Sequence, residues 1–163
     1  MSDVEYIIET TDLSKSYGPH LALENLNLKI RKGATGLLGP NGAGKSTFLK
    51  TILGLIQATS GHGTVLGHDI RTEGAAIRSR IGYMPEYDAL NPDMEAIHQV
   101  KYSGELLGMN PIVAMSRAHE VLQYVGLGEQ RYRNIGSFST GMKQATKLAC
   151  SIIHDPELII ADE

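Results

Sequence analysis

One segment constrains the fold of this 163-residue chain more than any other: the glycine-rich stretch GPNGAGKS at residues 39–46. It fits the pattern G-x-x-x-x-G-K-[ST], which requires a buried strand before it and a helix after it. The short apolar run at 34–38 predicts that strand, and the pattern from about residue 45 to residue 55 predicts that helix. This order of elements is typical of a loop that holds a phosphate chain.

The residue types of the loop suit that ligand. Glycines let the backbone adopt positive φ and approach a ligand closely, so that successive N–H groups can surround an anion. The helix that follows presents the positive end of its dipole. We expect Lys45 to reach the β- and γ-phosphates of a nucleotide and the Ser46 hydroxyl to ligate Mg²⁺. The alternative is an ordinary glycine-rich turn before a helix.

A second apolar run, at 158–161, is followed by Asp162 and Glu163. Such a run predicts a strand that is covered on both faces and whose carboxyl end emerges beside the phosphate loop. We expect Asp162 to hold Mg²⁺ through water and Glu163 to polarise an attacking water molecule. Taken alone, the same pattern also fits a strand end that simply lies in solvent.

The segment SFSTGMKQ at 137–144 opens a predicted helix, with Ser139 at its start. The apolar residues that recur at helical spacing are Met142, Ala145, Ala149, Ile152 and Ile153. A serine, a glycine and several free N–H groups at a helix N-terminus predict a second anion site. An ordinary capped helix is the alternative for this segment.

The rest of the chain predicts an α/β organisation. Polar and apolar residues alternate at 26–31, which is typical of a half-buried strand at an antiparallel edge, and further strands are predicted at 63–67 and 81–84. Residues 94–125 form a helical pattern broken near 108–111. We interpret this region as a helical lobe inserted between parts of a sheet.

Composition excludes several classes of protein. The formal net charge is −3, without a block of like charges, so no nucleic-acid groove is expected. The acidic N-terminus does not fit a secretory signal, and no stretch approaches the roughly 18 apolar residues of a membrane span. The single cysteine, Cys150, lies in a helical pattern and is interpreted as a buried structural thiol rather than a catalytic one.

Together these motifs resemble the ATP-binding cassette of ABC transporters over nearly the whole chain. GPNGAGKST resembles the Walker A motif of that family, FSTGM at 138–142 its signature motif, and LIIADE its Walker B motif. KSYG at 15–18 resembles the A-loop, and the Q-loop falls at GYMPEYDAL, where Glu86 replaces the usual glutamine. A carboxylate ligates Mg²⁺ better than an amide but cannot donate a hydrogen bond. The pairing of PE with STGM resembles exporter-type cassettes.

The resemblance implies an α/β P-loop NTPase fold with a mixed or parallel sheet core, N-terminal antiparallel β strands and an inserted helical subdomain at about 92–150, in a single domain over 1–163. It implies that Tyr17 stacks on adenine, although a core or turn tyrosine is the alternative. The residues implied to bind the cofactors ATP and Mg²⁺ are Tyr17, Gly39, Pro40, Asn41, Gly42, Ala43, Gly44, Lys45, Ser46, Thr47, Glu86, Ser139 and Gly141, with Ser46, Asp162 and Glu86 on the metal and Glu163 and Lys45 in catalysis.

The resemblance also implies partners. Two cassettes, as a homodimer or a heterodimer, would enclose ATP between the P-loop of one and Ser139 and Gly141 of the other. Their closure would power export through a separate membrane permease, whose short helix docks near 87–91. The protein would be cytoplasmic and peripheral on the inner face of the cell membrane, reaching the membrane only through the permease. Neither a D-loop nor a switch histidine follows the Walker B motif, so we expect a fragment that is poorly active alone.

A second class of function is a soluble ABC-type ATPase that acts in DNA repair or on the ribosome through ATP-driven dimerisation. Repair cassettes usually interrupt the sheet with a coiled coil, and ribosome-associated ones usually carry two P-loops; neither feature occurs in the sequence. A nucleotide kinase or GTPase fits less well, because it would leave the 137–144 segment unexplained.

Overall fold

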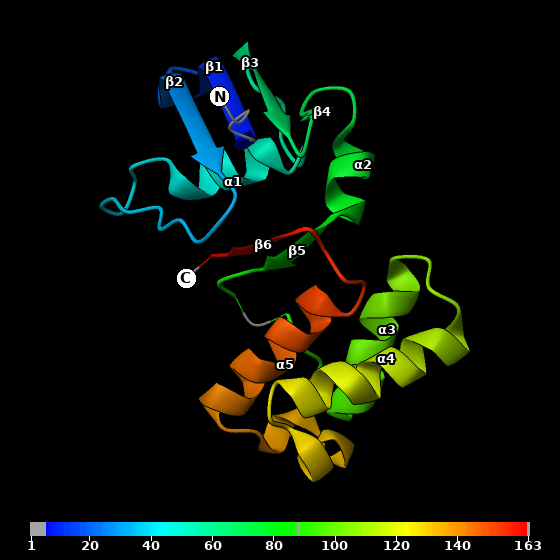
Figure 1. The fold of residues 1–163 in the computed structure, drawn as a ribbon. Helices are drawn as coiled ribbons and strands as arrows, with labels where there is room; N and C mark the ends of the chain where they lie inside the picture. The colour runs from blue at the N-terminus through cyan, green and yellow to red at the C-terminus, as the bar shows by residue number, and fades with distance from the viewer. Residues whose placement is uncertain (1–5, 88, 163) are drawn as a thin grey trace. The chain divides into compact units, whose positions relative to one another are not determined.

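The computed structural model describes residues 6–87 and 89–162 and divides into two compact units, Met1–Arg78 and Ser79–Glu163, which are described separately below. The first contains an antiparallel sheet with two short helices, and the second contains a parallel strand pair with a helical bundle (Figure 1). The structure is therefore mixed α/β, as the sequence predicts.

The sheet of the first unit has the order β2-β1-β3-β4. Its strands are β1 (Tyr6–Tyr17), β2 (His20–Arg31), β3 (Ser60–Val65) and β4 (His68–Asp69), and every pairing is antiparallel. In β2, Leu26, Leu28 and Ile30 are partly buried while the residues between them are exposed. This alternation confirms the predicted half-buried strand, which lies at an edge of the sheet as expected.

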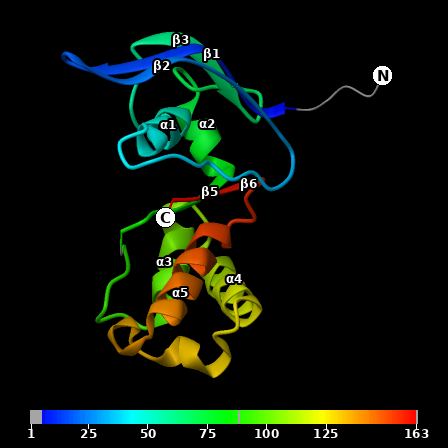
Figure 2. The same cartoon turned by 90° about the vertical axis from the view of Figure 1, so that its left-hand side faces the viewer.

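Helix α1 (Lys45–Ile52) packs against β2 and β3, along one face of the sheet in both views (Figure 1 and Figure 2). Its buried residues include Phe48 and Ile52, which are 3% and 0% exposed. The helix ends three residues earlier than predicted, because Gly54 adopts a φ of 65° just after the C-cap Leu53. A second helix, α2 (Gly74–Ser79), buries Ile77.

The strand predicted at 34–38 is not present. These residues have no regular secondary structure and are exposed, with Leu38 at 94% exposure. An apolar run forms a strand only where other strands accept its backbone hydrogen bonds and its side chains pack on neighbours. Among the described strands none pairs with this run, and Thr35 and Gly36 give it little apolar surface of its own.

In the second unit, β5 (Ile81–Met84) and β6 (Leu158–Ala161) pair in parallel, from Ile81 opposite Leu158 to Met84 opposite Ala161. Between them the chain forms α3 (Ala96–Leu106), α4 (Pro111–Tyr124), two 3₁₀ turns, η1 (Gly128–Tyr132) and η2 (Ile135–Ser137), and α5 (Thr140–Ile152). The three α-helices gather into one bundle in both views (Figure 1 and Figure 2).

The predicted helix break is confirmed by the ends of α3 and α4. Asn110 caps α4 by accepting a hydrogen bond from the Ile112 backbone N–H at 2.9 Å, and Pro111 occupies the first helical turn, where its missing N–H costs nothing. The bundle encloses an apolar core that includes Val100, Leu122 and Ile153.

Cys150 packs against this core, and burial raises the pKa of its thiol to about 11. A thiol with so high a pKa is a poor nucleophile at neutral pH, which agrees with the predicted structural role. Among the described residues, none of the helices combines the length and the apolar character needed to cross a bilayer.

Candidate functional site

The glycine loop of the first unit joins the irregular segment after β2 to the start of α1. Gly42 and Gly44 have φ angles of 84° and 86°, a conformation that side-chain-bearing residues rarely adopt. A Cβ built on Gly44 would lie 2.4 Å from the carbonyl oxygen of Ala22, whereas one built on Gly42 would meet nothing within 4 Å. Gly44 therefore packs against β2 of the sheet, and the space beside Gly42 is open.

Lys45 is the first residue of α1 and bends back over the loop. Its ammonium donates hydrogen bonds to the carbonyl oxygens of Gly39 and Pro40, at 2.5 and 3.0 Å. Ser46 follows on the same first turn and is exposed, and this turn carries no acidic residue. The positive end of the helix dipole, the lysine ammonium and the open loop thus coincide, which suits an anion.

Tyr17, the predicted adenine platform, ends β1 in this same unit. Its side chain is 47% exposed, so it is not a core tyrosine. The ammonium of Lys15 lies 5.0 Å from the centroid of its ring. A half-exposed aromatic ring beside a cation is a usable stacking surface, although the structure does not test whether adenine takes it.

In the second unit, the carboxyl ends of β5 and β6 bring Asp162 and the loop after β5 together. The Asp162 backbone N–H donates to the carbonyl oxygen of Met84 at 2.9 Å, and the Tyr83 hydroxyl donates to the Asp162 carboxylate at 3.3 Å. Burial first, and then the Asp162 carboxylate, raise the pKa of the Tyr83 phenol, and Glu86 adds to this effect. Tyr83 therefore stays protonated and orients Asp162.

Sequence reasoning missed Tyr83, which stands inside the GYMPE stretch but belongs to no recognised pattern of site residues. The signal that could have identified Tyr83 is the pairing of β5 with β6. Tyr83 lies opposite Ile160, and Ile160 precedes Asp162 by two residues. Glu163, the predicted catalytic base, lies outside the described residues.

The prediction that the strand at 158–161 is covered on both faces is wrong for the described structure. Ile160 is buried at 7% exposure, but Ile159 on the opposite face is 48% exposed. The strand pair has the helical bundle against one face, and β5 is its one pairing partner among the described strands. A strand in a two-stranded sheet is covered only where a helix packs on it.

Ser139 is the N-cap of α5, as predicted. Its hydroxyl accepts a hydrogen bond from the Met142 backbone N–H at 3.3 Å. Gly141 lies on the exposed first turn, and a Cβ built there would meet nothing within 4 Å. The start of this helix is therefore both capped and accessible.

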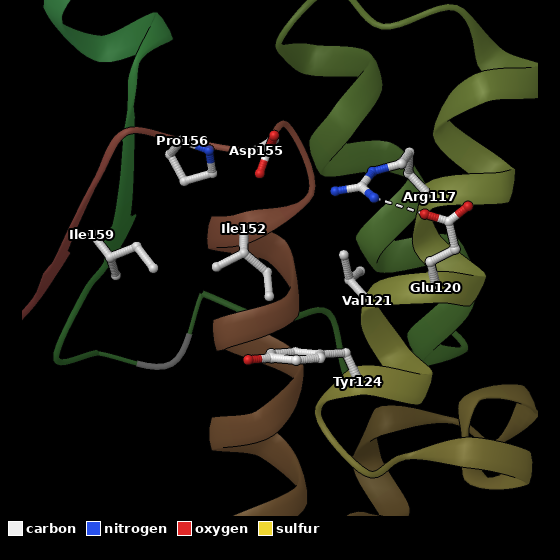
Figure 3. A pocket seen from close by; sticks show the side chains of 8 residues that line it. All are labelled: Arg117, Glu120, Val121, Tyr124, Ile152, Asp155, Pro156 and Ile159. Carbon is white, nitrogen blue, oxygen red and sulfur yellow. Dashed lines mark hydrogen bonds and ion pairs between the residues drawn. The ribbon is translucent and has the colours of Figure 1, made fainter.

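A hollow of about 440 Å³ lies elsewhere in the second unit, and none of the predicted site residues in the described part of the chain lines it. Val121 and Tyr124 of α4 face Ile152 of α5 across it, and an ion pair of 2.7 Å joins Arg117 to Glu120 on its α4 side (Figure 3). Besides its apolar walls, the hollow is lined by the charged residues Arg117, Glu120 and Asp155.

Comparison with known proteins identifies the family. The family model described as "ABC transporter" matches residues 23–163. The chain belongs to the ABC transporter family. This explains why the glycine loop, the Ser139 helix and the acidic end of β6 occur together in one sequence.

Named members of the ABC transporter family are similar over nearly all of the chain. The linearmycin resistance ATP-binding protein LnrL of Bacillus subtilis (strain 168) is 39% identical over 158 residues, which is 96% of this chain and 51% of that protein. The Nod factor export ATP-binding protein I of Cupriavidus metallidurans is 34% identical, over 96% of this chain and 52% of that protein. The chain thus spans about half the length of the curated relatives it matches.

The fold agrees with the same family. The solved structure of cbiO1 from Clostridium perfringens, part of the ABC transporter complex cbiONQ, superposes with a TM-score of 0.86. It is 23% identical and aligns with 98% of this chain and 66% of that chain. At this identity the likeness concerns the fold alone, and it agrees with the P-loop NTPase class predicted from the sequence.

The predicted site residues divide between the two units. Tyr17 and the loop 39–47 belong to the first unit. The second unit contains Glu86, Ser139, Gly141 and Asp162. Among the described residues, no three His, Cys, Asp or Glu side chains gather in a way that could hold a metal ion. The predicted Mg²⁺ ligands are one serine hydroxyl and two carboxylates, a set that differs from such a cluster. Their role in binding the metal stays a prediction.

Proposed function

We propose that this chain is the ATP-binding and ATP-hydrolysing part of an ABC transporter subunit that powers export through a separate membrane permease. The observation that carries the proposal is the position of Lys45, whose ammonium lies over an open glycine loop at the positive end of α1. The names of the two relatives described above, which refer to antibiotic resistance and to export, support the direction of transport. They give no support to a role in DNA repair or on the ribosome.

The residues of the first unit would bind the nucleotide. Backbone N–H groups of 39–47 would donate to the phosphate oxygens, and Lys45 would exchange its carbonyl partners for the β- and γ-phosphates. Tyr17 would stack on adenine, where a half-exposed ring loses little hydration on binding. All of these groups belong to the loop or to the end of β1, within the first unit.

The oxygen donors present also fit Mg²⁺, which prefers hydroxyl, carboxylate and water oxygens. Ser46 offers an exposed hydroxyl, and Asp162 offers a carboxylate that Tyr83 orients at 3.3 Å. Glu86 is an exposed carboxylate near the same tyrosine. When bound, the metal would neutralise charge on the phosphates. Glu163 would accept the proton of the attacking water.

The second unit would complete the site of a second cassette. Ser139 and Gly141, at the accessible start of α5, would contact the γ-phosphate held by the partner, in a homodimer or a cassette heterodimer. Residues 92–150 would form the helical subdomain of a single ATP-binding domain over 1–163, and a permease helix would dock near 87–91. The protein would lie in the cytoplasm against the inner face of the membrane.

Calorimetry on the protein at its full natural length tests the proposal. Lys45→Ala should weaken Mg-ATP binding by about 10- to 100-fold, because a charge-assisted contact to phosphate contributes roughly 1.5–3 kcal/mol. Lys50→Ala is the matched control, since Lys50 is exposed in the last turn of the same helix. Equal ATP affinity in both variants would exclude this loop as the nucleotide site.

A further inference from the structure

Helix α5 buries a lysine side chain in its middle. Lys147 is 6% exposed, and it lies two turns after the Ser139 cap. Burying an ammonium group costs free energy unless hydrogen bonds replace its hydration. We therefore expect the buried Lys147 ammonium to donate hydrogen bonds to nearby acceptors.

The partners are two backbone carbonyls of the loop that follows β5. The Lys147 ammonium donates to the carbonyl oxygen of Glu86 at 3.2 Å and to that of Tyr87 at 3.4 Å. The side chains of both residues are exposed, with Tyr87 at 70%. The loop is thus held to α5 through its backbone at Glu86 and Tyr87, while the side chains of these two residues are exposed.

The part of α5 that carries Lys147 is packed closely against β5. A Cβ built on Gly82 of β5 would lie 2.2 Å from the carbonyl oxygen of Ser151 of α5, so strand and helix are in close backbone contact. The Thr146 hydroxyl, 0% exposed, donates to the Met142 carbonyl at 2.8 Å within the same helix. A short lysine tether from a helix fixed in this way restricts where the loop can lie.

We propose that Lys147 is a positioning residue that ties the loop after β5 to α5 and so sets the place of the Glu86 carboxylate. The inference rests on the proposed function, because Glu86 matters only if this chain hydrolyses ATP. One helix then carries two functions: its first turn presents Ser139, and its middle holds Glu86. A movement of α5 moves both groups together.

The test compares Lys147→Met with the parent protein at its full natural length. Methionine keeps most of the side-chain volume and removes the donors, and replacing a buried charge by an apolar group of similar volume is often neutral for stability. Lys101→Met is the matched control, because it makes the same change on α3 and breaks the i,i+4 pair with Glu105.

Three results are expected for Lys147→Met. Hydrogen exchange in peptides that span Glu86 and Tyr87 should accelerate by about tenfold or more, since the loop loses a charge-assisted tether. The kcat for ATP should fall by roughly 10- to 100-fold through misplacement of Glu86, with ATP affinity within about twofold of the parent. The double variant with Glu86→Ala should be no slower than Glu86→Ala alone, because the two act through one group.

Unchanged exchange and unchanged kcat would overturn the inference, as would additive effects in the double variant. If Lys147→Met fails to fold, Lys147→Gln serves the same purpose, because its amide is too short to reach the loop. The exchange measurement needs no ATP, so it tests the tether even if the proposed function is wrong. Equal ATP affinity in Lys45→Ala and Lys50→Ala would instead refute the proposed function, and it would leave the inference about the Lys147 tether unaffected.

Discussion

Ser139 carries two roles that substitution can separate. The structure gives it the cap of α5, and the proposed function gives it a contact with a γ-phosphate. Ser139→Ala removes both. Ser139→Asp keeps an oxygen that can accept from the Met142 N–H, but it adds a negative charge where a phosphate should come. Stability and ATP-dependent dimerisation should therefore respond differently to the two changes.

The expected stability changes follow from the cap geometry. At 3.3 Å, the bond between the Ser139 hydroxyl and the Met142 N–H is at the long end for an N–H···O bond. We expect Ser139→Ala to cost about 0.5–1 kcal/mol, the lower half of the range for a lost cap. Ser139→Asp should be neutral or stabilising by about 0.3–1 kcal/mol, since the first turn of α5 holds no acidic residue to repel it.

Urea denaturation measures the stabilities, and a sizing column with Mg-ATP measures the dimer, in a Glu163→Gln background that prevents hydrolysis. Both Ser139 variants should dimerise more weakly, with Asp the weaker. Asn110 provides the control, because it caps α4 in the same way: Asn110→Ala should lower stability and leave the dimer unchanged. A Ser139→Asp protein that dimerises as well as the parent would refute the phosphate contact, and a fully stable Ser139→Ala protein would refute the cap.

Two further predictions concern the nucleotide. Glu163→Gln should leave ATP binding intact and slow hydrolysis by about 10²- to 10⁴-fold, the usual effect of losing a general base; normal turnover in a phosphate-release assay would exclude the role given to Glu163. Tyr17→Ala should weaken ATP and GTP binding alike, by roughly 1–3 kcal/mol if the ring stacks on the base, while Tyr17→Phe is tolerated. A large loss with phenylalanine in calorimetry would mean that the hydroxyl, not the ring face, makes the contact.

Local patterns predicted several elements and their bounds, although β5 and β6 are paired with each other across a long stretch of sequence. The strand at 81–84, the strand at 158–161 and the start of the helix after Ser139 coincide with β5, β6 and α5. Turn and cap residues mark such boundaries in the sequence itself. The sequence also identified the glycine loop, since glycine is the residue type that most readily adopts the positive φ found at Gly42 and Gly44.

The predictions that were wrong, and the residues that were missed, depend on contacts between distant segments. A run such as 34–38 has the composition of a strand, but only a paired neighbour makes it one. Tyr83 and Lys147 have no local signal, because their roles come from segments 79 and 61 positions away in the sequence. Buried polar tethers of this kind are visible only once the chain is folded.

The β5–β6 register explains why the acidic groups and the Ser139 helix belong to one unit. Met84 pairs with Ala161, so the two strands end at the same level, and the chain leaves them toward Glu86 and Asp162 respectively. Parallel pairing requires a long connection between the strands, and here that connection is the helical bundle whose last member is α5. The helix that starts at Ser139 must therefore return to the strand pair just before β6, and Lys147 meets the loop after β5 on that return path. The coupling that we infer between Ser139 and Glu86 is in this sense a consequence of the topology, to which the lysine adds a direct bond.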